Sequence, residues 1–169
     1  LEKDQYKAAL ENYIKSDLKI KDYEIIHKEF GVIPMSLASF ERNPNAQKRI
    51  VNIGTAGGFT KASSGYTFQF IQRNTANIVK SLSSGSNPNQ ALTFRDKMFQ
   101  WYDRTLVEVI LSKSMAGKDI FAKMFNKLQI ERILRFLGNE SSLLDDLKII
   151  TSLPLKPFLI AGITRLKKG

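Results

Sequence analysis

The stretch that decides the fold lies at residues 50–72 and reads IVNIGTAGGFTKASSGYTFQFIQ. Its first four residues, 50–53, are mostly apolar and predict a short buried strand. A glycine-rich loop follows, and apolar residues at helical spacing then predict a helix over about residues 65–82. Glycines let a ligand approach the main chain, and the first N–H groups of a helix are unpaired. This strand–loop–helix therefore predicts a site for an anion or for the polar edge of a cofactor ring.

The sequence on either side predicts mainly helices. Residues 4–18 carry apolar side chains at helical spacing, whereas residues 23–35 read as extended. The polar residues 40–48 predict a turn. A linker rich in serine at residues 83–88 ends the helix that follows the glycine loop, and everything after Pro88 is predicted to be helical.

The second half of the chain also shows signals for individual helix ends. Gly138 is a predicted C-cap, and Ser142 with Asp145 predicts the start of the next helix. These patterns together predict an α+β fold that is predominantly α. We expect an incomplete α/β region at residues 1–85, followed by a helical region at residues 86–169.

Composition narrows the class of protein. Of the 169 residues 43% are hydrophobic, which is enough for a real core, and there is no cysteine for a disulfide or a thiolate metal site. The net charge of +10 indicates either an anionic partner or simply a solvated basic surface. No apolar run reaches the length of a membrane span. If a membrane is involved, the chain is expected to lie on it.

Five short motifs occur in an order that resembles the lycopene β-cyclases of bacteria and plants. The motifs are residues 29–35 (EFGVIPM), 54–61 (GTAGGFTK), 64–68 (SGYTF), 98–106 (MFQWYDRTL) and 135–137 (RFL). The resemblance rests on the ordered set, which covers most of the chain. It implies an isomerase (an intramolecular lyase) that closes the end rings of an acyclic carotenoid, with lycopene as substrate. The resemblance also implies reduced FAD as cofactor and NADPH as reductant.

In the reaction that the resemblance implies, a proton adds to the terminal alkene and a tertiary carbocation forms. A neighbouring double bond attacks this cation, and loss of a ring proton yields the β-ring with no net redox change. The flavin contacts implied are Gly54, Gly57, Gly58, Ser64, Gly65 and Tyr66. Glu29 is the acidic residue of a motif near the expected substrate region, and its alternative role is a surface carboxylate paired with a lysine such as Lys28. No metal is expected.

The chain also departs from the family pattern. Ala62 stands where the family often has proline, and Ser36 follows the Ile-Pro-Met sequence. Neither a Gly-x-Gly-x-x-Gly fingerprint nor the family's Phe-Leu-Glu-Glu-Thr motif occurs, and by family order both lie before Leu1. We therefore expect a C-terminal fragment of the cyclase, which alone is inactive and binds flavin weakly, with the main acid upstream.

Two other interpretations stay open at this point. One is a different FAD-dependent oxidoreductase of the same superfamily, such as a prenyl reductase or hydroxylase, although those carry an acid where this chain has residues 52–56 (NIGTA). The other is a basic helical module that binds lipid or nucleic acid. Because acidic residues are interleaved with the basic ones, we expect no nucleic-acid partner. The expected location is cytoplasmic, peripheral to an anionic membrane surface. The apolar tail 153–166 is expected either to contact that surface or to dock into the core of the protein.

Overall fold

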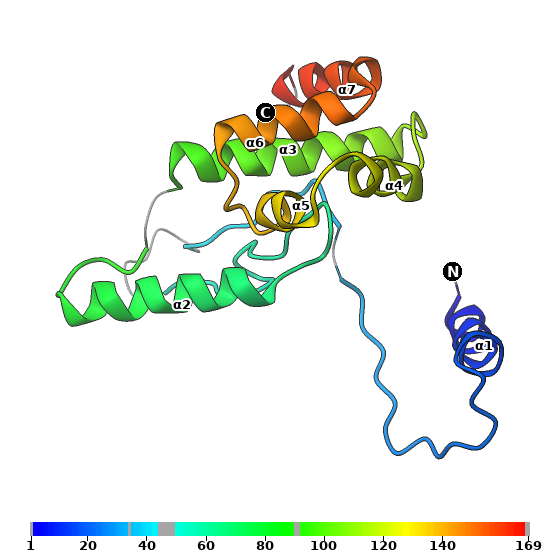
Figure 1. Ribbon diagram of the computed structural model, residues 1–169. Helices are drawn as coiled ribbons and strands as arrows, with labels where there is room; N and C mark the ends of the chain where they lie inside the picture. The colour runs from blue at the N-terminus through cyan, green and yellow to red at the C-terminus, as the bar shows by residue number, and fades with distance from the viewer. Residues whose placement is uncertain (1, 34, 44–49, 90–91, 168–169) are drawn as a thin grey trace. The chain divides into compact units, whose positions relative to one another are not determined.

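The structure is a computed structural model that describes residues 2–33, 35–43, 50–89 and 92–167. The chain divides into two compact units, Leu1–Val32 and Ile33–Gly169. Figure 1 shows that regular structure in the described residues consists of helices joined by loops. The predominantly α character predicted from the sequence is confirmed. The boundary expected between residues 85 and 86 falls inside the second unit, between two of its helices.

The predicted strand at residues 50–53 is not confirmed, because no strand is found in the part of the chain that the structure describes. A strand must form hydrogen bonds with a neighbouring strand. Among the described residues of this unit no other strand pairs with residues 50–53. Most of the turn predicted at residues 40–48 lies outside the described residues, as do Pro34 and Lys168.

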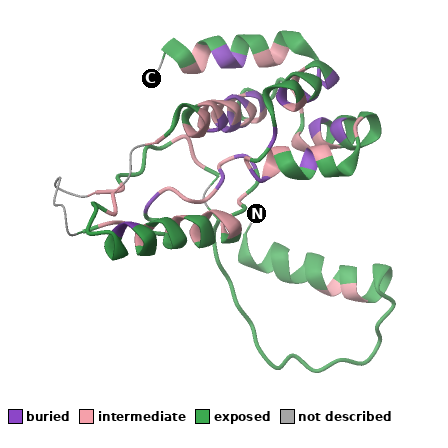
Figure 2. Ribbon diagram, turned by 60° about the vertical axis from the view of Figure 1, so that its left-hand side comes forward, coloured by how far each residue is buried: buried purple, intermediate pink, exposed green. Residues whose placement is uncertain are grey.

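The first unit contains the helix predicted at residues 4–18. It runs as α1 (Lys3–Asn12) and continues as a π-helical turn, η1 (Tyr13–Asp17). None of the residues of α1 is buried, although Tyr6 meets the ring of Phe30 edge-on at 6.1 Å between centroids. Figure 2 shows α1 exposed along nearly its whole surface. The apolar stripe of α1 is therefore left uncovered within its own unit.

The described part of the second unit holds the remaining helices. They are α2 (Phe68–Ser83), α3 (Phe94–Leu111), α4 (Gly117–Lys127), α5 (Ile130–Leu137), α6 (Leu143–Ser152) and α7 (Leu155–Lys167). The buried core lies among α3–α7, as the purple segments of Figure 2 show. Its buried members are Val109, Ile120, Met124, Ile133, Ile149, Leu153 and Ala161. Each of these side chains except the small Ala161 contributes about 1.5–3 kcal/mol when fully buried.

Helices α3 and α7 pack most extensively on each other. At their crossing, the Trp101 Nε1 group donates a hydrogen bond to the Gly162 carbonyl at 3.2 Å. A Cβ on Gly162 would lie 2.9 Å from Trp101 Cζ2, so the glycine allows the two helices to approach. This places the only tryptophan of the chain between α3 and α7.

The helix ends follow from local sequence. Ser142 caps α6 by accepting a hydrogen bond from the Asp145 amide at 3.2 Å, which confirms the predicted start. Gly138 is the C-cap of α5, also as predicted, but the left-handed residue is Asn139, with φ of 57°. The Glu140 amide then bonds the Arg135 carbonyl at 2.7 Å, closing a Schellman motif. The turn therefore fixes where the Asn139 side chain lies.

Candidate functional site

The glycine-rich segment forms a compact loop before α2. The Asn52 amide donates to the Arg42 carbonyl at 2.8 Å, and the Asn52 side chain donates to the Glu41 carbonyl at 2.8 Å. The loop then closes through the Phe59 amide, which donates to the Gly54 carbonyl at 3.0 Å. These bonds take the place of a strand ladder and fix the loop to residues 41–42.

Two glycines are required by this packing. A Cβ on Gly57 would collide with the Asn52 carbonyl oxygen. Gly58 has φ of +72°, and a Cβ there would lie 2.9 Å from the Phe40 Cβ. The fold of the loop therefore explains both glycines without a ligand, although it also leaves their main chain open to one.

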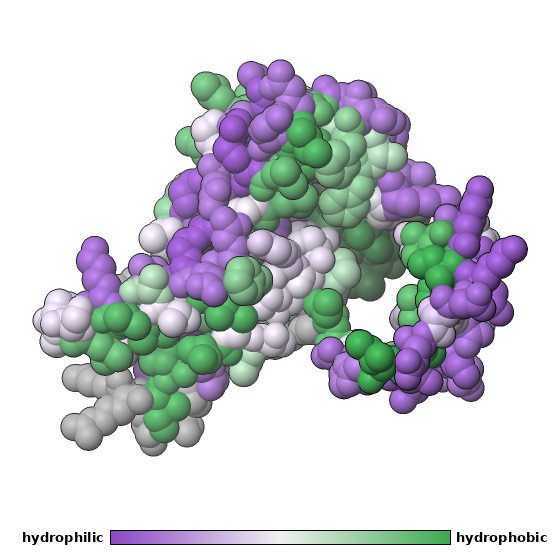
Figure 3. Space-filling model, turned by 60° about the horizontal axis from the view of Figure 1, so that its bottom comes forward, coloured by the Kyte–Doolittle hydropathy of each residue, from purple (hydrophilic) through white to green (hydrophobic). Residues whose placement is uncertain are grey.

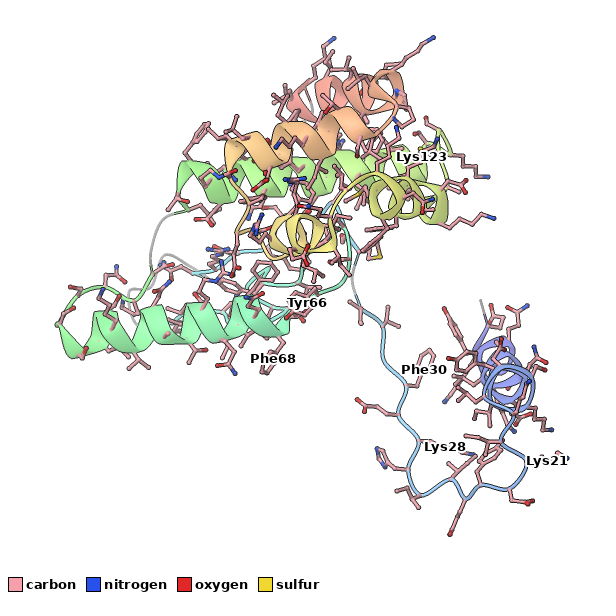
Figure 4. The ribbon with its side chains drawn as sticks, in the orientation of Figure 1. Lys21, Lys28, Phe30, Tyr66, Phe68 and Lys123 are labelled. Carbon is pink, nitrogen blue, oxygen red and sulfur yellow. The ribbon has the colours of Figure 1, made fainter. Side chains whose placement is uncertain are left out.

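The next turn, residues 61–67, precedes α2 instead of opening it. Helix α2 begins at Phe68, three residues after the predicted position, because the Gly65 amide bonds back to the Lys61 carbonyl at 2.8 Å. Gly65 has φ of +72°, and a Cβ there would lie 2.7 Å from Ile33 Cγ2. Figure 4 shows Tyr66 just before α2 and Phe68 projecting away from it into solvent. A Gly65→Val substitution would therefore strain the loop whether or not a ligand is bound.

A polar cavity of about 470 Å³ lies beside the glycine loop. Its lining includes Gly57 and Gly58 but none of the other predicted contacts, which are Gly54, Ser64, Gly65 and Tyr66. Amides and cations from α2, α3 and the loops complete it: Arg42, Arg73, Asn74, Asn77, Gln100, Arg104 and Asn139 are among them. The volume is that of a small-molecule site, and its polar lining suits an anionic or hydrogen-bonding ligand.

Two arginines give this cavity its positive character. The guanidinium of Arg42 lies 4.3 Å from the centre of the Phe59 ring, and burial lowers the pKa of Arg42, with Asp96 opposing that effect. Arg104 also lines the cavity and has no ion pair with any described residue.

A buried ion pair forms one wall of the cavity. Lys61 Nζ lies 2.6 Å from Asp103 Oδ1 and donates to Asn139 Oδ1 at 2.7 Å, while Ser63 Oγ donates to the same Asp103 oxygen at 2.7 Å. Lys61 also lies 5.8 Å and 6.0 Å from the centres of the Phe99 and Phe136 rings. Side-chain exposure is only 1% for Lys61 and 10% for Asp103, so the pair is desolvated.

The charge state of Asp103 reflects two opposing influences. Burial raises the pKa of the Asp103 carboxyl, and the Lys61 ammonium and the Ser63 hydroxyl, which favour the carboxylate, offset only part of that rise. The Asp103 carboxyl therefore holds a proton more readily than an exposed aspartate does.

Asp103 also lines a second, apolar cavity of about 110 Å³ among α3–α7. The Asp103 carboxylate therefore stands between a polar space and a hydrocarbon space. The predicted flavin contacts stay a prediction, and the family itself is decided by the sequence comparison. The sequence matches the family described as "Lycopene cyclase protein" over residues 1–162.

The chain belongs to the lycopene cyclase family. Comparison with the curated proteins and with the solved structures gives no significant match. The family match favours the cyclase interpretation over a different flavoprotein and over a basic binding module, and it implies a carotenoid substrate. None of the described helices is both long and apolar enough to cross a bilayer.

Other predicted residues of this lycopene cyclase chain lie in the first unit. Glu29 is exposed and sits between Lys28 and Phe30, which Figure 4 labels on the extended segment. His27 is exposed on the same segment. The catalytic role of Glu29 stays a prediction. Among the described residues no group of three or more His, Cys, Asp or Glu side chains could hold a metal.

Sequence reasoning missed the pairing of Lys61 and Ser63 with Asp103. The structure pairs Asp103 with Lys61 across 42 positions of sequence. A signal was present: Asp103 shares one helix face with the apolar residues Phe99 and Val107, four positions away on each side, and a carboxylate on such a face needs a partner.

Proposed function

We propose that this chain is the C-terminal part of a lycopene β-cyclase that closes carotenoid end rings by proton-initiated cyclisation, with reduced FAD and with NADPH as reductant. The observation that carries the proposal is the polar cavity walled by Gly57 and Gly58 and by the Lys61–Asp103 pair, in a chain of the lycopene cyclase family. The protein's reaction class would be an isomerase with no net redox change.

The cavity residues fit part of a flavin. Gly57 and Gly58 carry no side chains, so a ring edge or a ribityl chain can approach the main chain there, although both amides already donate within the loop to the Ile53 and Thr55 carbonyls. The arginines Arg42 and Arg104 suit a phosphate or an anionic ring. Gly54, Ser64, Gly65 and Tyr66 belong to the same loop system and are proposed contacts through the family motif. When bound, reduced flavin would supply negative charge close to a cationic intermediate.

The residues of this chain would orient and desolvate the reactants. The Lys61–Asp103 pair fixes the loop against α3, so that the glycine backbone keeps its position. The apolar residues of α3–α7 would exclude water, which otherwise captures a carbocation. Glu29 and an acid outside these 169 residues are the proposed proton donors. We further propose that the chain alone neither cyclises lycopene nor binds FAD tightly, because the family's dinucleotide unit supplies the adenosine contacts.

A membrane surface is part of the proposal, since the substrate is insoluble in water. Large apolar side chains on α7 are exposed: Leu155, Leu159, Ile160, Ile163 and Leu166. Basic residues on the same helix include Lys156 and Lys167, which suit anionic head groups. Figure 3 shows hydrophobic side chains at the surface among hydrophilic ones. We propose a cytoplasmic enzyme peripheral to the membrane.

The test is pigment analysis in lycopene-accumulating bacteria that express the complete reading frame encoding this chain. We expect β-rings, and we expect the purified protein to carry FAD. The Arg42→Gln variant should lose both flavin and rings, whereas Arg135→Gln, an arginine outside the cavity, should retain both. Unchanged lycopene with the wild-type protein, or cyclisation by a flavin-free preparation, would refute the proposal.

A further inference from the structure

Among the described residues, the linings of the apolar cavity among α3–α7 and of the polar cavity share only Asp103. The lining of the apolar cavity is almost entirely hydrocarbon and includes Trp101, Leu106, Phe121, Met124, Phe136 and Phe158. The few polar residues are largely satisfied within the protein. Thr105 Oγ1 donates to the Trp101 carbonyl at 2.8 Å, and Ser63 donates to Asp103. Water entering this cavity would find few partners, so the cavity suits an apolar occupant.

Two parts of the cavity lining differ in chemistry. Leu155 and Leu159 of α7 belong to the lining and are 49% and 60% exposed, so the cavity reaches the surface at these side chains. Asp103 supplies a carboxylate to the lining, and the same residue also lines the polar cavity. Its Oδ1 accepts from Lys61 and Ser63, while Oδ2 has no hydrogen-bond partner among the described residues.

We propose that the apolar cavity binds the branched hydrocarbon end of the carotenoid, which enters past Leu155 and Leu159 and ends at Asp103. This inference rests on the proposed function. Aliphatic and aromatic walls exclude water from the hydrocarbon. The Asp103 carboxylate, held by Lys61 and Ser63 through Oδ1, provides a fixed negative charge toward the cation that forms during cyclisation. Because Lys61 and Ser63 both bind Oδ1, the second oxygen, Oδ2, stays available to interact with the cation.

The first experiment measures occupancy of the cavity in the 169-residue chain. The probe is parinaric acid, an acyclic conjugated polyene that accepts excitation energy from tryptophan, and Trp101 on the cavity wall is the only tryptophan. We expect quenching of Trp101 emission. Leu159→Gln should weaken binding about tenfold, since an apolar contact at the rim is replaced by a polar group.

The matched control is Ile160→Gln. Ile160 is the next residue of α7 and is 59% exposed, against 60% for Leu159, but it does not line the cavity. Probe binding to this variant should equal that of the wild type. Equal weakening by both substitutions would mean that the probe lies on the α7 surface, and no weakening by either would mean that it lies elsewhere. Each of these two results overturns the inference.

The second experiment uses the complete enzyme in lycopene-accumulating cells. Leu159→Gln should lower ring formation about tenfold with unchanged flavin content. Leu147→Gln should leave both unchanged, because Leu147 of α6 is also exposed, at 57%, and does not line the cavity. Normal ring formation by Leu159→Gln, when that variant has lost the probe, would overturn the assignment of the carotenoid to this cavity. Failure of the wild type to form rings would instead refute the proposed function, and the probe experiment alone would then decide whether the cavity binds hydrocarbon.

Discussion

Two ion pairs in the second unit have similar chemistry, but the pKa of the carboxyl is raised in one pair and lowered in the other. Lys61–Asp103 joins the glycine loop to α3 at 2.6 Å, and Arg132–Asp145 joins α5 to α6 at 2.8 Å. Burial raises the pKa of Asp103, whereas hydrogen bonds from Arg132 lower the pKa of Asp145. Side-chain exposure is 10% for Asp103 and 16% for Asp145. Their cationic partners differ more, with 1% exposure for Lys61 and 20% for Arg132. The difference teaches that desolvation of the whole pair, more than its distance, decides its cost.

The largest expected effect comes from breaking the buried pair on one side. Lys61→Met leaves the Asp103 carboxylate desolvated and without its cation, and unfolding free energy at pH 7 should fall by about 3–5 kcal/mol. Urea-induced unfolding followed by circular dichroism measures it. The double variant Lys61→Met/Asp103→Leu should recover most of the lost unfolding free energy, because no buried charge remains. A single-variant loss below about 1 kcal/mol would show that the pair is not desolvated.

The pH dependence of Asp103→Asn sharpens the comparison further. The folded pKa of Asp103 lies above its ordinary value of 3.8, so the folded protein binds more protons than the unfolded chain between those two pKa values. The Asp103 carboxyl therefore stabilises the wild type less as pH rises through this window. Relative to the wild type, Asp103→Asn should gain stability from pH 3 upward and then level off. An opposite slope would contradict the raised pKa.

Asp145→Asn should show the reverse dependence. Its folded pKa lies below 3.8, so its ion pair stabilises the protein above that pH and the contribution is lost as pH falls through the folded pKa. The variant should be less stable than the wild type at pH 7, and the two should converge in acid. Thermal unfolding of both proteins across that range is the measurement. A destabilisation that persists unchanged at the acid end would assign the effect to packing.

The smallest effect is expected at the exposed pair between Arg73 and Glu140. Their side chains are 44% and 47% exposed, with 3.0 Å between Arg73 NH2 and Glu140 Oε1. Arg73→Gln should cost only about 0.5–1 kcal/mol, and less in high salt. A loss as large as that of Lys61→Met would remove burial as the explanation of the difference between the two pairs.

The sequence was a good guide where a helix packs on its own neighbours. Periodicity located the helices after Pro88, and the Ser142 and Gly138 signals gave true helix ends. Such signals are local, since a cap and its amide lie within a few residues. The helix after the glycine loop was placed too early because Gly65 turns the chain back to Lys61 before α2 begins.

Contacts between distant segments were beyond the sequence. Nothing in residues 50–53 indicates that Asn52 bonds to residues 41 and 42 instead of a strand. The pairing of Asp103 with Lys61 was likewise missed, because the two residues lie 42 positions apart in the sequence. Of the predicted flavin contacts, Gly57 and Gly58 line the polar cavity, and only tertiary packing separates them from the other four.

The connection between α5 and α6 predicts where homologous chains can differ in length. Each of its five residues holds a partner: the Gly138 carbonyl accepts from Arg73, Asn139 from Lys61, Glu140 from Gln69 and Arg73, the Ser141 carbonyl from Arg95, and Ser142 from Asp145. One inserted residue would shift the following residues out of register with these partners, so that several of the hydrogen bonds would be lost together. Insertions and deletions should therefore be absent here among homologous sequences, while Ser84 and its neighbours after α2 tolerate them.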